Sequence, residues 1–314
     1  MVYNTSLGDM DQLATMIANK NPHCAQSTNP THATAFQPLL HHGFSERMKY
    51  TPRQPKEKRS IVHRGQRKLL MSEIGLLVQL DPRRDYTVVY AGAAPGIHTP
   101  FLSELFPNVT FQLYDPSPFK IAETDRIKLF NIPFTDDEAK QYANVPNLVF
   151  ICDIRRSTDE HLVWEDMQMQ QRWHEIMEPE FTSLKFRLPW PEHGVLQSGV
   201  NTVEYLDGDI HLPIWGWQST TESRLVIKKG RHQGRKTYDC LVYEEEMSFF
   251  NKVVRPSIHY QPVRGGGLDG CYDCTAEVTL LRTYVTDRGW GNVMRNVSML
   301  SSRITRHLGV GITD

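Results

Sequence analysis

Residues 87–106 read TVVYAGAAPGIHTPFLSELF, and this stretch decides the fold class. Its first five residues, TVVYA, are β-branched or apolar and predict a buried strand. The chain then turns at Gly92-Ala93-Ala94-Pro95-Gly96 and continues from His98 to Phe106 in a run that is compatible with a helix. A strand that passes through a glycine-rich turn into a helix is typical of a doubly wound α/β sheet, in which ligands bind at the carboxyl ends of the strands.

Further segments predict the rest of the sheet. Strands are expected at Val109–Tyr114 and Asn147–Cys152, which end on Asp115 and Asp153, and an amphipathic helix is expected at Gln66–Leu80. Continuous apolar strands separated by helical segments are typical of a buried parallel sheet. Later strands are expected at 184–188, 224–229 and 278–285. The fold class is therefore α/β, with a mixed, mostly parallel central sheet flanked by helices.

Composition and charge indicate a globular protein without a global attraction to nucleic acid. The chain has 314 residues, 39% of them hydrophobic, and 35 basic against 36 acidic residues give a net charge of −1. Basic residues concentrate between Ser45 and Leu70, either as a solvated linker or as a surface that follows phosphates. We expect residues 1–45 to form a polar N-terminal extension and residues 46–314 to form a single domain.

Cysteine usage and hydropathy indicate the compartment. The five cysteines are odd in number and scattered, which favours a reducing compartment, so we expect the cytoplasm. No stretch approaches the roughly eighteen apolar residues of a membrane helix, and we expect no membrane partner. Cys271-Tyr272-Asp273-Cys274 has no second pair at zinc spacing, so no metal is expected.

The turn after the first strand predicts a nucleoside ligand that carries no pyrophosphate. Glycines let the backbone approach a ligand closely, and Asp115, 23 positions after Gly92, is placed to accept hydrogen bonds from ribose hydroxyls. The turn lacks the three-glycine pattern of dinucleotide sites, and Pro95 offers no amide hydrogen to a phosphate. S-adenosyl-L-methionine has an adenosine and a methionine zwitterion but no phosphate, so it is the expected cofactor. The alternative is a tight turn without a ligand.

Four charged residues, which are Lys68, Asp153, Lys185 and Glu222, are the candidate catalytic residues. If the sheet forms as predicted, Asp153 stands at a strand end beside the donor site, and Lys185 and Glu222 lie near strands of the same sheet. Each residue alone is an ordinary surface charge. Together they suit methylation of a ribose hydroxyl, because a lysine held neutral by desolvation and a nearby positive charge can take the proton of this poor nucleophile. Lys185 is the candidate base.

Six segments resemble the poxvirus cap-specific nucleoside 2′-O-methyltransferases, which also serve as the small subunit of the viral poly(A) polymerase. The segments are GQRKLL (65–70), VVYAGAAPGIH (88–98), FICDIR (150–155), SLKFRLPWPE (183–192), ESRL (222–225) and YEEEMSFFNKVVR (243–255). Their order and spacing are similar from about residue 60 to the end of the chain. The resemblance implies a Rossmann-like S-adenosylmethionine-dependent methyltransferase fold. It also implies that the Lys-Asp-Lys-Glu tetrad of ribose 2′-O-methyltransferases falls on Lys68, Asp153, Lys185 and Glu222.

The resemblance further implies a donor site that binds S-adenosyl-L-methionine and releases S-adenosyl-L-homocysteine. Its residues are Gln66, Tyr90, Gly92, Ala94, Pro95, Gly96, His98, Asp115, Asp153 and Ile154. One departure is visible, because the poxvirus proteins have an arginine two residues after the second-strand aspartate, where this chain has Ser117. This difference affects the adenosine pocket.

A capped RNA needs its own recognition site. A 7-methylguanine is positively charged, so it stacks well between aromatic rings, and its N1 and exocyclic amine donate to carboxylates. Trp190, Glu192 and Glu244 meet this need, and the resembling family has a phenylalanine and acidic residues at these places. Tyr50 is the nearest match to the second stacking aromatic. The alternative for Trp190 is a half-buried core side chain.

Arg155 and Arg187 are candidates for contacts with the phosphates of the first transcribed nucleotides. Two functions are therefore predicted. The first is a cap-specific 2′-O-methyltransferase acting on 7-methylguanosine-capped mRNA in the cytoplasm, meaning the host cytoplasm or the virion if the protein is viral. The second is an RNA-binding processivity or regulatory subunit, a partner of a poly(A) polymerase catalytic subunit or RNA polymerase, with methyl transfer secondary.

Overall fold

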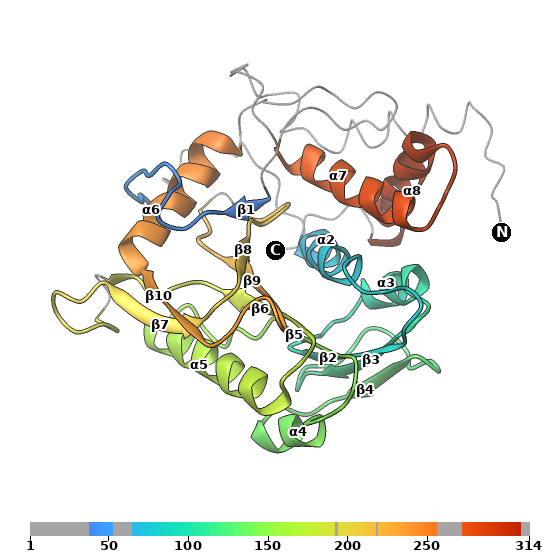
Figure 1. The fold of residues 1–314 in the computed structure, drawn as a ribbon, viewed down its shortest axis with the longest axis horizontal. Coiled ribbons are helices and arrows are strands. Elements are labelled where there is room, and N and C mark those ends of the chain that lie inside the picture. Colours follow the sequence, from blue (N-terminus) through green and yellow to red (C-terminus); the bar gives the residue numbers. More distant parts are fainter. Residues whose placement is uncertain (1–37, 53–64, 192–193, 218, 256–271, 309–314) are drawn as a thin grey trace.

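One large sheet organises the protein (Figure 1). The structure is a computed structural model that describes residues 38–52, 65–191, 194–217, 219–255 and 272–308. In these ranges the large sheet has eight strands in the order β1-β8-β9-β6-β5-β2-β3-β4. The strands are β1 (Leu39–Leu40), β2 (Tyr86–Ala91), β3 (Val109–Tyr114), β4 (Ile127–Phe130), β5 (Leu148–Cys152), β6 (Phe181–Phe186), β8 (Asp209–His211) and β9 (Ser223–Lys228). A separate antiparallel pair consists of β7 (Thr202–Leu206) and β10 (Arg235–Asp239).

The direction of the strands confirms the predicted mixed, mostly parallel sheet. Strands β4, β3, β2, β5 and β6 run parallel to one another, whereas β9 is antiparallel to β6 and β8, and β1 is antiparallel to β8. The carboxyl ends of β2, β3 and β5 therefore lie at one edge of the sheet. Gly92, Asp115 and Asp153 follow these three ends directly.

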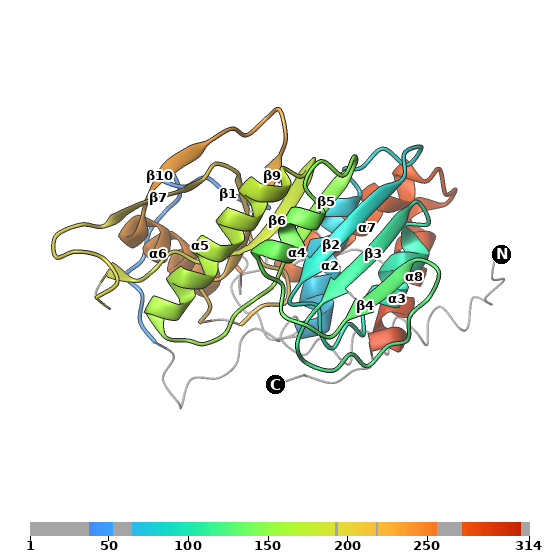
Figure 2. The same cartoon turned by 90° about the horizontal axis from the view of Figure 1, so that it is seen from below.

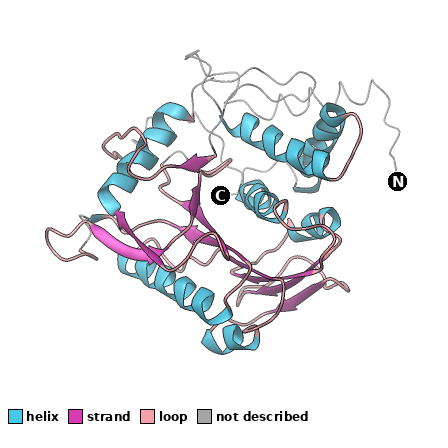
Figure 3. Cartoon of the chain, in the orientation of Figure 1, coloured by secondary structure: helices cyan, strands magenta, loops and turns pink. Residues whose placement is uncertain are grey.

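Helices cover both faces of the sheet (Figures 1 and 2). One face carries α2 (Gly65–Leu77), α3 (Thr99–Leu105), α7 (Tyr272–Asp287) and α8 (Val293–Leu308), and the other carries α4 (Asp136–Gln141) and α5 (Glu160–Met177). Helix α6 (Cys240–Phe249) follows β10 and continues into a π-helical turn, Phe250–Val254. Figure 3 shows the same layers coloured by type of element. None of the helices in the described ranges is long and apolar enough to cross a membrane.

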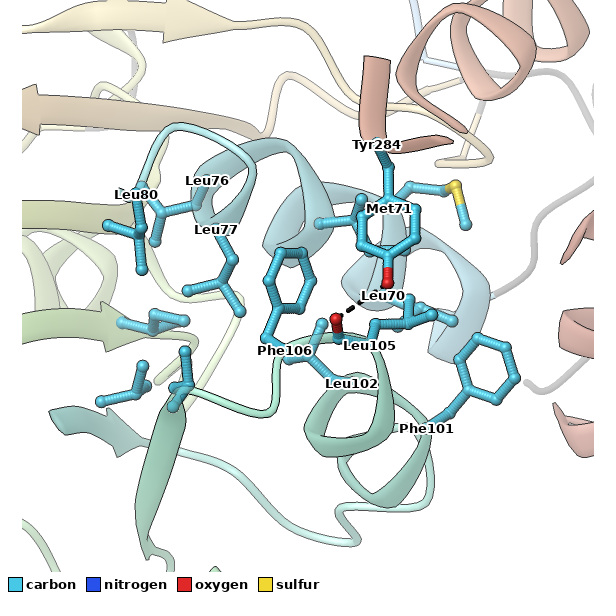
Figure 4. Packing of buried hydrophobic residues seen from close by; sticks show 14 of the residues in the cluster. Leu70, Met71, Leu76, Leu77, Leu80, Phe101, Leu102, Leu105, Phe106 and Tyr284 are labelled. Carbon is cyan, nitrogen blue, oxygen red and sulfur yellow. Dashed lines mark hydrogen bonds between the residues drawn. The ribbon is translucent and has the colours of Figure 1, made fainter. Parts of the chain in front are cut away.

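The core under α2 accounts for the apolar face of this helix (Figure 4). The buried residues Leu70 and Leu77 belong to one apolar cluster with Leu102 and Phe106 of the α3 region. The Tyr284 hydroxyl of α7 donates a hydrogen bond of 2.8 Å to the carbonyl oxygen of Leu105, so three helices are joined here. The helical spacing predicted for Gln66–Leu80 thus corresponds to an observed buried face.

The predicted strand at 278–285 is wrong, because these residues lie inside α7. Val278, Leu281 and Val285 are buried and recur every three or four residues, which is the spacing of one helix face. This face belongs to the cluster that also includes α2 and α8. A short run of apolar and β-branched residues is ambiguous between strand and helix, and here packing between helices decides the outcome.

The N-terminal segment contributes an edge strand. Leu39 and Leu40 pair with His211 and Ile210 of β8. The predicted extension of residues 1–45 therefore includes a strand of the large sheet, while residues 1–37 lie outside the described residues.

Candidate active site

The turn after β2 brings two strand ends into close contact. Gly92 has a φ of +79°, and a Cβ atom there would lie 2.9 Å from both the backbone nitrogen and Cγ1 of Ile154. Only glycine tolerates both this positive φ and the lack of space for a Cβ atom. The Gly92 N–H donates to the Tyr114 carbonyl at 2.8 Å, and the Asp153 N–H donates to the Ala91 carbonyl at 2.9 Å. The backbone after β2 is therefore held against the segment that follows β5.

The second part of the turn is tied to Asp115. One carboxylate oxygen of Asp115 accepts from the Ala94 N–H at 3.1 Å, and the other accepts from the Ser117 N–H at 2.8 Å. The carbonyl of Pro95 accepts from the backbone of Lys120 at 2.9 Å. Gly96 also has a positive φ of +73°. The predicted donor residues of this turn thus lie together at the carboxyl ends of β2 and β3.

The structure brings the four predicted catalytic residues, called the tetrad below, into one chain of contacts. Lys68 Nζ of α2 lies 3.0 Å from Glu222 Oε1, just before β9. Lys185 Nζ of β6 lies 3.5 Å from Glu222 Oε2 and 3.4 Å from Asp153 Oδ1, which follows β5. Four segments that are distant in sequence therefore meet at one edge of the sheet.

Arg224 is a fifth member of this cluster that the sequence analysis missed. It is buried, forms an ion pair with Asp153, and donates to the Cys152 carbonyl at 3.0 Å. Its Cα is the register partner of Lys185 across β6 and β9. A charged residue inside the apolar strand RLVIK, opposite a candidate base, was the available signal.

The carboxylates of the tetrad are strongly held in their ionised form. Burial alone would raise the pKa of Glu222, but the attraction of Lys68 and Lys185 overcomes it and holds this pKa well below its ordinary value. The pKa of Asp153 is also lowered, because Arg224 and Lys185 outweigh the opposing effect of burial. Three cations and two carboxylates thus share the site, which leaves an excess of one positive charge.

The other predicted donor residues lie beneath this cluster. Tyr90 of β2 is buried, and its hydroxyl has no hydrogen-bond partner within the described ranges. Burial, with contributions from Glu73 and Asp153, raises the pKa of Tyr90 well above its ordinary value. Gln66 of α2 contacts His98, whose Nδ1 lies 2.9 Å from the Gln66 Oε1.

The two predicted cap-stacking aromatics meet on the neighbouring surface. The ring centroids of Tyr50 and Trp190 are 5.1 Å apart, and the rings are tilted by 44°. The Tyr50 hydroxyl donates to the Ser219 carbonyl at 3.1 Å, and the Arg187 guanidinium lies 4.9 Å from the Trp190 ring centroid. Burial and, to a smaller extent, the negative charge of Glu244 raise the pKa of Tyr50. Glu192 lies outside the described residues.

A cavity of about 250 Å³ is lined by both Trp190 of the aromatic pair and Glu222 of the tetrad. Its lining also includes Arg155, Arg187 and Trp217. Trp217, which the sequence analysis also missed, is 38% exposed. The predicted phosphate-binding arginines are themselves positioned by acidic residues of α5, since Arg187 pairs with Glu160 and Arg155 lies 3.8 Å from Asp166.

Within the described ranges, no group of three or more histidine, cysteine, aspartate or glutamate side chains is arranged to hold a metal ion. Cys274 is buried in α7, and Cys271 lies outside the described residues.

The sheet order and the glycine-rich turn after β2 define a doubly wound, Rossmann-like α/β protein. The chain belongs to the poly(A) polymerase regulatory subunit family, whose sequence model matches residues 37–310.

Individual relatives come from poxviruses. A cap-specific mRNA (nucleoside-2′-O-)-methyltransferase of myxoma virus (strain Lausanne) is 24% identical over 298 residues, covering 86% of this chain and 84% of that protein. A protein of the same name from fowlpox virus (strain NVSL) is 26% identical over 217 residues, covering 62% of this chain and 68% of that protein. The solved structure of bluetongue virus VP4, described as a multifunctional RNA-capping production line, superposes with a TM-score of 0.45 and 13% identity over 76% of this chain and 41% of VP4.

Proposed function

We propose that this chain is a cap-specific RNA methyltransferase. It transfers a methyl group from S-adenosyl-L-methionine to the 2′-hydroxyl of the first transcribed nucleotide of 7-methylguanosine-capped RNA. One observation carries this proposal: two lysines and two carboxylates from four separate segments meet beside the glycine-rich turn. The names of the myxoma and fowlpox relatives support the same substrate class.

The residues around the turn suit a donor that lacks phosphates. The nitrogen of Pro95 in this turn carries no hydrogen that could be donated to a phosphate, and Tyr90 is buried in the strand that leads into the turn. We propose that Gln66, Tyr90, the 92–96 turn and Asp115 hold the donor, with Ile154 and His98 behind them. When bound, the donor supplies an electrophilic methyl group.

Lys185 is the proposed proton acceptor. In its neutral form the amine takes the proton of the ribose 2′-hydroxyl, which makes the oxygen a better nucleophile. Asp153 and Glu222 hold the Lys185 amine through contacts of 3.4 and 3.5 Å, and Lys68 partly neutralises Glu222. Methyl transfer requires the nucleophile to align with the bond that breaks, so we expect positioning to supply much of the rate.

The Tyr50–Trp190 pair is the proposed cap site. The two rings contact each other, so they must separate to admit the charged guanine between them. Glu192 and Glu244 are proposed to accept hydrogen bonds from the base. The cavity lined by Trp190 and Glu222 then takes the first nucleotide, and Arg155 and Arg187 in the same lining contact its phosphates.

A methyl-transfer assay tests the proposal. The full chain is mixed with labelled donor and capped RNAs that differ only at guanine N7 or at the first ribose 2′-hydroxyl. Label should enter RNA with a free 2′-hydroxyl, and the same RNA already methylated at this oxygen should take none. Label in the premethylated RNA would show a different acceptor and overturn the assignment.

A substitution of Trp190 tests the proposed cap site. Trp190→Ala should raise KM for capped RNA about 5- to 150-fold, because stacking on one base is worth about 1–3 kcal/mol, and it should leave kcat nearly unchanged. Trp290→Ala removes a half-buried tryptophan that packs on Tyr284, and it serves as the matched control. Equal KM values for the two variants would remove Trp190 from the cap site.

A second role is favoured by the family description. Because the chain belongs to the poly(A) polymerase regulatory subunit family, we propose that it also binds RNA as the partner of a poly(A) polymerase catalytic subunit. Co-purification with such a subunit and longer poly(A) tails in its presence are the expected results. A chain that neither co-purifies nor changes tail length would contradict this role.

A further inference from the structure

Residues 219–222, called the linking segment below, join the aromatic pair of the proposed cap site to the tetrad. The carbonyl of the first residue accepts from the Tyr50 hydroxyl at 3.1 Å. The Thr221 hydroxyl oxygen accepts from Trp190 Nε1 at 3.4 Å. Glu222, the last residue of the segment, contacts both lysines of the tetrad. Three peptide units span at most about 11 Å, so a displacement at one end of the segment affects the other.

The linking segment is held from the side of α6 by Asn251. This residue lies in the π-helical turn that follows α6 and is 1% exposed. Its Nδ2 donates to the Thr220 carbonyl at 2.8 Å and to the Met247 carbonyl at 3.0 Å. The Thr220 hydroxyl accepts from the Glu222 N–H at 3.0 Å. The amide of Asn251 therefore fixes the backbone two residues before the tetrad carboxylate.

The orientation of the Asn251 amide is determined from both of its ends. Arg255 Nη1 donates to Asn251 Oδ1 at 3.0 Å, and a guanidinium only donates hydrogen bonds. The two carbonyls on the other side only accept, so the NH₂ group must face them. Arg255 itself donates to the carboxylate of Asp273 at 2.9 and 3.1 Å, and both side chains of this ion pair are buried. A buried ion pair thus anchors the amide that holds the linking segment.

The same part of the chain also holds the residues around Tyr50. Lys252, next to Asn251, donates to the Thr51 carbonyl at 2.8 Å, and its Nζ lies 5.5 Å from the Tyr50 ring centroid. Ser248 of α6 donates to the carbonyl of residue 49 at 3.4 Å. Helix α6 and its π-helical turn therefore support both Tyr50 and the linking segment. Such turns are frequent at functional sites.

We propose that Asn251 is a positioning residue that acts on the cap site and on the tetrad together, because it fixes the linking segment between them. This inference rests on the proposed function. Asn251 is buried and reaches both sites only through the Thr220 carbonyl. Loss of its NH₂ group should therefore weaken cap binding and slow methyl transfer at the same time. A change in Lys185 or Trp190, by contrast, should affect one of the two.

Two substitutions remove the NH₂ group in different ways. Asn251→Asp keeps the side-chain size and the acceptor for Arg255, and Asn251→Ala removes the donor without adding a charge. Asn147→Asp is the matched control, because Asn147 also accepts from an arginine, Arg84, and donates to a backbone carbonyl, that of Asp85, at 2.9 Å. It precedes β5, at the end of this strand that lies away from the tetrad.

Three measurements on the full chain separate the effects. Tryptophan fluorescence gives Kd for 7-methylguanosine triphosphate, and calorimetry gives Kd and the number of sites for S-adenosylhomocysteine. Methyl transfer to capped RNA at saturating substrates gives kcat for each donor-binding site. Asn251→Ala should lower kcat and weaken 7-methylguanosine triphosphate about 2- to 12-fold each, the usual worth of one hydrogen bond, and leave S-adenosylhomocysteine within about twofold.

Asn251→Asp should have the larger effect on both quantities, because it places a second acceptor against the Thr220 carbonyl. Asn147→Asp should leave all three quantities within about twofold. A loss confined to kcat, or confined to cap affinity, would show that Asn251 acts on one site only and would overturn the inference. Weaker S-adenosylhomocysteine binding in the Asn251 variants, or equal losses in the control, would show a general structural role and also overturn it.

The inference and the proposed function fail in different ways. If the wild-type chain neither binds 7-methylguanosine triphosphate nor transfers a methyl group to capped RNA, the proposed function is wrong and this inference falls with it. If the wild-type chain does both and the Asn251 variants match it, only the role of Asn251 is wrong.

Discussion

Two neighbouring residues of α2, Arg67 and Lys68, belong to ionic clusters of opposite character. Arg67 donates to both oxygens of Glu277 at 2.7 and 2.5 Å and to Ser301 Oγ at 3.0 Å. Glu277 also accepts from Trp215 Nε1 at 2.9 Å and from Ser301 Oγ at 2.6 Å. The side chains of Arg67 and Glu277 are 5% and 0% exposed. We call these four residues the Arg67 cluster.

The tetrad, by contrast, is looser and partly open. Lys68 and Glu222 are 19% and 21% exposed and share one contact of 3.0 Å, and Lys185 reaches its two carboxylates only at 3.4 and 3.5 Å. Its cations also outnumber its carboxylates once Arg224 is counted.

The difference shows what each cluster can do. A dry, two-pronged ion pair with every donor engaged has no capacity left for a ligand, so the Arg67 cluster fixes α2 against α7 and α8. A site with long contacts and an uncompensated cation retains donors and acceptors that a substrate can engage. Because consecutive residues of a helix point in different directions, one turn of α2 serves both purposes.

The largest effect is expected at the tetrad. Lys185→Ala should lower kcat about 10²- to 10⁴-fold, the usual contribution of a general base, while donor affinity and the thermal midpoint change little. Single-turnover rates of methyl transfer measure this directly. Lys229→Ala removes a lysine from an exposed pair with Glu178 and serves as the matched control. Unchanged methylation in the Lys185 variant would exclude this residue as the base.

The next effect concerns the Arg67 cluster and should appear in stability. Arg67→Ala leaves the Glu277 carboxylate buried without its cation, and such losses cost about 3–5 kcal/mol in free energy of unfolding. Urea denaturation followed by circular dichroism gives this value. Arg83→Ala, which breaks an exposed pair with Asp81, should leave the urea midpoint unchanged. A stable Arg67 variant would contradict the structural role of this cluster.

Much of the fold was predictable from sequence because the strands before the site are continuous and apolar. Val109–Tyr114 was predicted with its observed bounds, and the first strand differs by one residue at its start. Residues 278–285 were mispredicted because a short apolar and β-branched run suits a strand as well as a helix, and the buried face that α7 packs against α2 and α8 decides for the helix.

The residues of the candidate site also fall into those that the sequence predicts and those that it does not. Asp153 and Lys185 could be predicted from their residue type and their position at the carboxyl ends of apolar strands, and Lys68 from its position at the start of the preceding helix. Arg224 was missed because a buried charge becomes meaningful only with its partner, and its partner Asp153 lies far back in the chain. A polar residue inside an apolar run was the only signal at this position.

The smallest expected effect is the pH dependence of the Arg67 cluster. Burial would raise the pKa of Glu277, but Arg67 and the hydrogen bonds from Ser301 and Trp215 hold this pKa below its ordinary value of 4.5. A lowered pKa in the folded state means that ionised Glu277 stabilises the fold fully above about pH 4.5, and that this contribution is lost as pH falls toward the folded-state pKa. The difference in free energy of unfolding between wild type and Glu277→Gln should therefore be constant from about pH 8 to 5.5. Below about pH 4.5 it should shrink by at most about 1.4 kcal/mol per pH unit, as measured by urea denaturation at each pH. A difference that grows on acidification would show that Glu277 is protonated in the fold, and the contrast with the tetrad would then need a different explanation.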